Sequence, residues 1–143
     1  MREFITSFEA GSYPKEQWTH KSHVLMAIWY LYHHPLHQAR NLIKEGIKNY
    51  NLAQGGANSD TEGYHETITE FYIQIIAGYL SVVSLERGFA DIVSAIDEEI
   101  FLEKSFPFQY YTREVLFSKQ ARLHWVSPNV KPILSYRRSP EAA

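Results

Sequence analysis

Three histidines lie near the beginnings of two long apolar segments of the chain. His20 and His23 belong to the stretch Trp-Thr-His-Lys-Ser-His at 18–23, and His65 belongs to Gly-Tyr-His-Glu-Thr at 63–67. A neutral imidazole can bind a divalent metal ion or act as a base. If the two segments are neighbouring helices, three such rings could converge in an apolar core and form a metal site or an acid–base site.

A helix over residues 14–33 carries His20 and His23 on one face. The two residues are three apart, so their rings are neighbours on the helix surface. Glu16 lies on the same line before them, and Ala27 lies below them. The pattern therefore places the imidazoles at the mouth of an apolar surface.

A second helix, over residues 59–86, points His65 inward. Tyr72 and Ile76 share its apolar face, whereas Glu66 lies about 100° away, at the boundary of that face. The positive end of the helix dipole disfavours imidazolium near a helix N-terminus. We therefore expect the His65 ring to be neutral, the form that binds metal or acts as a base.

A metal site built from these residues would use His20, His23 and His65 as ligands. Glu16 or Glu66 would be an optional carboxylate ligand. Ligands of this kind suit Zn²⁺, Ni²⁺, Fe²⁺ or Mn²⁺. The motif is not the His-Glu-x-x-His of zinc proteases, because residue 21 is a lysine.

The sequence predicts a small metal-dependent enzyme, a hydrolase or a lyase, that acts on an organic substrate. If no metal is bound, His65 would act with Glu66 or a tyrosine such as Tyr72 as a general acid–base pair. Four further residues are candidates for ligand binding: Trp18, Tyr64, Tyr111 and Arg113.

Two other interpretations remain open. The protein could be a non-catalytic module whose aromatic pocket holds a small apolar molecule while the histidines fix its polar end. The histidine cluster could also be purely structural, because a buried imidazole is often satisfied by a tyrosine hydroxyl or a backbone carbonyl. Replacing His65 would then mainly change stability, by about 1–2 kcal/mol.

Composition limits the functional classes. Apolar residues make up 45% and charged residues 21% of 143 residues, a globular rather than a disordered balance. The net charge of −2 gives no electrostatic case for nucleic acid or for an anionic membrane, and the longest apolar run, 24–32, is shorter than the ~20 residues of a membrane span.

The absence of cysteine excludes thiolate ligands and suits the cytoplasm. No organic cofactor is indicated, since Gly55-Gly56 lacks the ending of a phosphate-binding loop, and a homodimer is possible.

The hydrophobic periodicity predicts a single all-α domain, an irregular bundle of five or six helices. Its core spans about 14–126, and an extended tail follows over about 127–143 and frays after Tyr136. The helices at 14–33 and 59–86 are expected to be antiparallel neighbours at the centre. Further helices are expected at 35–50, 89–101, 109–117 and 118–125, with Ser59 to Glu62 as a capping box and Ser118 as an N-cap.

The combination of Trp18-Thr19-His20-x-x-His23, Tyr50-Asn51 and Gly63-Tyr64-His65-Glu66-Thr67 resembles a family of small, uncharacterised bacterial proteins. Tyr110-Tyr111-x-Arg113-Glu114 and Leu116-Phe117-Ser118 also fit that pattern. The resemblance covers about residues 14–126 and implies a shared pocket but no established reaction. A looser similarity is to DinB-type helical bundles, in which histidines from separate helices bind a divalent metal. Their helix order and motif spacing differ, so this comparison is an analogy only.

Overall fold

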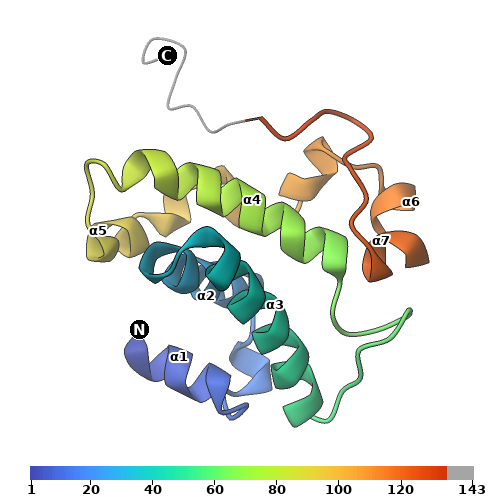
Figure 1. The fold of residues 1–143 in the computed structure, drawn as a ribbon, viewed down its shortest axis with the longest axis horizontal. Helices are drawn as coiled ribbons and strands as arrows, with labels where there is room; N and C mark the ends of the chain where they lie inside the picture. The colour runs from blue at the N-terminus through green and yellow to red at the C-terminus, as the bar shows by residue number, and fades with distance from the viewer. Residues whose placement is uncertain (135–143) are drawn as a thin grey trace.

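The computed structural model describes residues 1–134, and within them it contains α-helices and short 3₁₀ turns but no strand (Figure 1). The prediction of a single all-α domain is confirmed. The seven helices of this part are α1 (Arg2–Glu9), α2 (His20–His33), α3 (Leu36–Ala53), α4 (Glu66–Val83), α5 (Phe89–Ser94), α6 (Arg113–Leu116) and α7 (Lys119–Leu123). The predicted count of five or six helices roughly matches these seven, of which three have only four to six residues.

Helices α2, α3 and α4 form the centre of the molecule, and α4 packs against both of the others (Figure 1). The first turns of α2 and α4 share one cavity, which His20 and Tyr72 both line. Their last turns share a second hollow, lined by Tyr32 and Ser84 among others. The two helices therefore run in the same direction, and the prediction that they are antiparallel was wrong.

Aliphatic and aromatic side chains from all three central helices fill the core. Ile28, Ile43, Phe71 and Ile76 are each at most 1% exposed. Burying one such side chain contributes about 1.5–3 kcal/mol to folding. Helix α1 joins this core, because Phe8 stacks on both Trp18 and Tyr50.

Helices α2 and α4 begin later than the periodicity predicts. The side chain of Thr19 accepts the backbone N–H of Ser22 and starts α2 at His20, so residues 15–17 form a separate 3₁₀ turn. The predicted capping box at Ser59 only closes a turn, in which the Ser59 hydroxyl accepts the N–H of Glu62. Helix α4 cannot start there, because the backbone of Gly63 is left-handed with a φ of +81°.

Beyond α4, tertiary contacts decide the path of the chain more than helix propensity does. The helix predicted over 89–101 ends at Ser94 and continues as 3₁₀ turns, where Phe101 packs on Tyr79. The helix predicted over 109–117 is reduced to α6, whose N-cap is Thr112. Ser118 caps α7 as predicted, by accepting the N–H of Ala121, and α7 ends at Leu123 rather than near residue 125.

The extended tail packs on the beginning of α4 and on the segment before α6. The Thr67 hydroxyl donates to the carbonyl of His124 and accepts the N–H of Val126, and the Tyr111 hydroxyl donates to the Val126 carbonyl. The predicted fraying after Tyr136 lies outside the described residues. Within residues 1–134, no helix combines the length and the apolar character needed to cross a membrane.

Candidate functional site

A cavity of about 340 Å³ lies between α2, α3 and α4. Its walls are mainly aliphatic, and its polar side chains are His20, His23, Thr69 and Tyr72. None of the lining residues found in the described part of the chain carries a formal charge at neutral pH. The apolar lining residues are Val24, Met26, Ala27, Ile43, Ile47, Ile68, Ile73 and Ile76.

The prediction that His20 and His23 share a face above Ala27 is confirmed, because all three line this cavity. Helix α3 also contributes, through Ile43 and Ile47. The sequence assigned that helix no part in the site. Its apolar stripe at four-residue spacing could have shown which of its residues reach the cavity.

The chemical state of His23 follows from its hydrogen bond. Its Nδ1 lies 2.8 Å from the carbonyl oxygen of Thr19, one turn earlier. A carbonyl oxygen can only accept, so Nδ1 must carry the proton and Nε2 must carry a lone pair in the neutral ring. Trp18 packs against the imidazole with a centroid distance of 3.9 Å and restricts its rotation.

His20 carries its proton on the other ring nitrogen. Its Nε2 lies 3.2 Å from the carbonyl oxygen of Phe101, so Nε2 carries the proton and Nδ1 keeps the lone pair. A salt bridge of 2.9 Å between Lys21 and Asp97 ties the same part of the chain to α2. The segment around residues 97–101 therefore fixes the tautomer of His20.

Two hydroxyl groups complete the polar lining. The Tyr72 ring lies 5.2 Å from the His20 ring, measured between centroids, and burial raises the pKa of the Tyr72 phenol. Its hydroxyl makes no hydrogen bond to any other residue of the described chain. The Thr69 hydroxyl also lines the cavity.

Both histidines are neutral at physiological pH. Burial lowers the pKa of His23 to about 4, and the neighbouring His20 adds to this effect, although the hydrogen bond to Thr19 opposes it. Burial also lowers the pKa of His20, against the hydrogen bond to Phe101, and the charge of Lys104 adds to the lowering. The site therefore offers imidazole lone pairs rather than positive charge.

These shifts predict a loss of stability in mild acid. A histidine whose pKa is lower in the folded state than its ordinary 6.5 stabilises the fold fully above pH 6.5, and this contribution declines as the pH falls. For His23, the free energy of unfolding should fall by about 2 kcal/mol between pH 6.5 and pH 5. Urea unfolding across this range should show the decline, and His23→Gln should make it shallower by the part due to His23, while His20 and His65 keep theirs. A profile as steep in His23→Gln as in the wild type would contradict the assignment.

His65 is placed differently from the prediction, and it does not line the cavity. It is the N-cap of α4: its Nδ1 accepts the N–H of Ile68, and its Nε2 donates to the carbonyl of Leu116 at 2.8 Å. Burial lowers its pKa, and Arg122 adds to this effect against the hydrogen bond to Leu116. Both ring nitrogens are thus occupied, and the ring joins α4 to α6.

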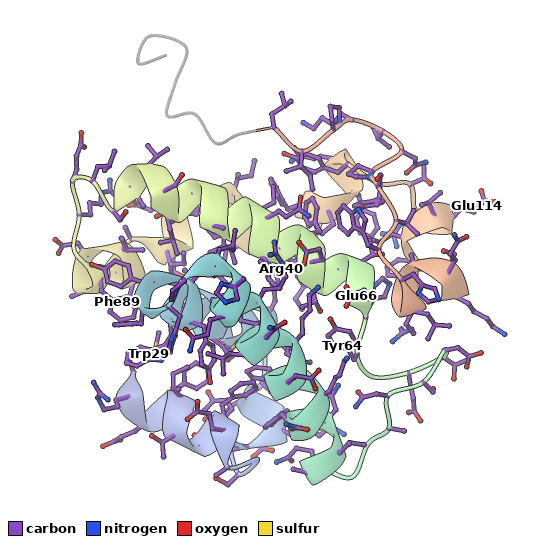
Figure 2. The ribbon with its side chains drawn as sticks, viewed as in Figure 1. Trp29, Arg40, Tyr64, Glu66, Phe89 and Glu114 are labelled. Carbon is purple, nitrogen blue, oxygen red and sulfur yellow. The ribbon has the colours of Figure 1, made fainter. Side chains whose placement is uncertain are left out.

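Glu66 belongs to an ionic network between α3 and α4. Its carboxylate accepts a hydrogen bond from the Tyr64 hydroxyl and lies 2.9 Å from Lys44. Figure 2 shows Tyr64 and Glu66 close together at the beginning of α4, with Arg40 on the same side of the molecule. The predicted general base is therefore paired with a lysine outside the cavity.

The centre of that network is Glu70. Glu70 is 7% exposed and binds Lys44 at 2.8 Å and Arg40 at 2.9 Å. Burial raises the pKa of Glu70, but hydrogen bonds from Lys44, Arg40 and Gln74 outweigh that effect, and the pKa is lowered. The sequence carried a signal for this pairing, because Arg40/Lys44 and Glu66/Glu70 are both four residues apart.

The remaining candidates are dispersed. Glu16 is exposed in the 3₁₀ turn before α2, and Tyr111 is buried with its hydroxyl bonded to the tail. The Arg113 guanidinium lies over the Phe108 ring, 4.4 Å from its centroid. Trp18 supports the His23 ring from behind, so of the predicted site residues only His20, His23 and Tyr72 line the cavity.

Among residues 1–134, no group of three or more His, Asp or Glu side chains is arranged to hold a metal ion. His20 and His23 could supply two ligand nitrogens, and the third predicted ligand, His65, uses both of its ring nitrogens elsewhere. Comparison of the chain with protein-family models, curated proteins and solved structures found no match.

Proposed function

We propose that the cavity between α2, α3 and α4 binds a small, uncharged and largely apolar molecule, whose polar end lies against His20, His23 and Tyr72. The observation that carries this proposal is the combination of an aliphatic cavity with two imidazoles whose tautomers are set by backbone carbonyls. Binding pockets for small molecules are commonly apolar, with a few well-placed polar groups of this kind.

The ligand is uncharged because the cavity has nothing to neutralise an ion. No charged side chain is among its lining residues in the described chain, and both histidines stay neutral at physiological pH. An ion without a partner in apolar surroundings loses hydration that such walls cannot replace. A neutral ligand keeps the benefit of the apolar walls without that loss.

Calorimetric titration with hexanol, hexanoate and hexylamine tests this function. Hexanol should bind, and the two ions, which share its alkyl chain, should bind at least about tenfold more weakly. Ala27→Leu narrows the cavity and should weaken hexanol binding, whereas Ala90→Leu, at an exposed position of α5, should not. Equal binding of all three probes, or of none, would overturn the proposal.

A metal-dependent enzyme is the second candidate, favoured by the free lone pairs of His20 and His23 on one helix face. A metal bound there would lower the pKa of its water or polarise a carbonyl group of the substrate. Elemental analysis of protein without a His-tag, beside His20→Ala and His65→Ala, tests it. One equivalent of a transition metal that is lost in His20→Ala would support this function, and a metal-free protein would count against it.

A further inference from the structure

We infer that the polar end selected by the cavity is a primary carboxamide. This inference rests on the proposed binding function and specifies the chemical class of its ligand. It follows from the hydrogen-bonding groups on the cavity wall. Two imidazole nitrogens there can only accept, the Tyr72 hydroxyl is free to donate, and the Thr69 hydroxyl can do either.

The acceptors are fixed by bonds made outside the cavity. His20 uses Nε2 to donate to the carbonyl of Phe101, and His23 uses Nδ1 to donate to that of Thr19. Each ring therefore keeps one nitrogen lone pair, and neither ring can turn to offer an N–H without breaking its bond to the backbone. The Thr69 hydroxyl, which also lines the cavity, can donate or accept.

The donor is Tyr72, whose hydroxyl has no hydrogen-bond partner within residues 1–134. Burial raises its pKa, so the phenol keeps its proton at physiological pH. The ring lies beside His20, at a centroid distance of 5.2 Å. A ligand that enters between them meets one donor and two imidazole acceptors that come from adjacent turns of α2.

A primary carboxamide matches this inventory without carrying charge. Its two N–H groups can donate to the lone pairs of His20 and His23, while its carbonyl oxygen accepts from the Tyr72 hydroxyl. An alcohol has only one donor, a carboxylate has none, and an ammonium group finds no counter-charge. A tertiary amide keeps the carbonyl but has no N–H, so it would leave both imidazole acceptors unpaired.

Titration of the whole protein with hexanamide, N,N-dimethylhexanamide and hexanol tests the inference. Hexanamide should bind at least about tenfold more tightly than N,N-dimethylhexanamide, because it makes two additional hydrogen bonds, and about threefold or more tightly than hexanol, because it makes one. In His23→Phe the advantage over the dimethyl compound should fall severalfold. The matched control is His33→Phe: His33 donates Nδ1 to the carbonyl of Trp29 in the same way but does not line the cavity, so this variant should keep the full preference.

The outcomes separate the inference from the proposed function. Binding of hexanol and both amides with equal affinity would overturn the carboxamide while leaving an apolar binding cavity. Failure of all three probes would overturn both. A preference for hexanamide that survives unchanged in folded His23→Phe protein would also overturn the inference, since the lone pair of His23 would then have no part in it.

Discussion

Gly63→Ala is expected to destabilise the fold by about 3 kcal/mol or more. Gly63 has a φ of +81°, a conformation that L-residues with a side chain adopt only with strain. A Cβ at this position would also lie 2.0 Å from the carbonyl oxygen of Ala57, a backbone atom that cannot move aside alone. Chemical unfolding monitored by circular dichroism measures the loss.

Gly55→Ala is the matched control for this prediction. Gly55 has nearly the same φ, +86°, but a Cβ there meets no atom within 4 Å. Gly55→Ala should therefore lower the free energy of unfolding only by the cost of a left-handed backbone at alanine, about 1–2 kcal/mol. If the two variants were equally stable, the close approach of residues 57 and 63 would not be a feature of the folded protein in solution.

Lys44→Met is expected to lower the free energy of unfolding by about 3 kcal/mol. Lys44 bridges Glu66 and Glu70, at 2.9 and 2.8 Å, and its own side chain is only 17% exposed. Without the ammonium group, Glu70 keeps Arg40 as a partner but remains nearly buried, and Glu66 keeps only the tyrosine hydroxyl. Breaking one member of a buried ionic network leaves the others without compensation for their lost hydration.

Two further observations test the network. Lys119→Met removes an exposed pair with Asp60, at 3.8 Å, and should change stability by less than about 0.5 kcal/mol. Lys44→Met should also unfold at a higher pH in acid titrations, because Lys44 helps to hold the pKa values of both glutamates low. Equal small effects of both lysine substitutions would show that the network contributes little.

The periodicity of the sequence predicted the fold class and the face of α2 that carries His20 and His23. These features depend on local geometry, since residues three and four apart share a helix face. The N-caps at Thr112 and Ser118 are local in the same sense, and Ser118 was recognised from its residue type. The direction of α4 relative to α2 depends on the path of the long connection between α3 and α4, which periodicity does not describe.

The place of His65 could not be read from a helical wheel, because His65 precedes the helix rather than belonging to it. The left-handed backbone of Gly63 delays the start of α4, and the imidazole then takes the capping role usually filled by a serine or an aspartate. Its second partner is the carbonyl of Leu116, 51 residues away. The residues next to His65 in the sequence give no indication of that contact. Because His65 bonds there, the predicted cluster of three histidines is reduced to the pair His20 and His23.

The most direct test of the binding cavity is nitrogen-15 NMR of the histidine side chains at neutral pH, with and without saturating hexanamide. We expect neutral His23 protonated at Nδ1, neutral His20 protonated at Nε2, and a shift of the two unprotonated nitrogens when the amide is added. The His33 resonances should not move. Charged or oppositely protonated rings at His20 and His23, or resonances of these rings that do not shift when hexanamide is added, would contradict the site proposed for this protein.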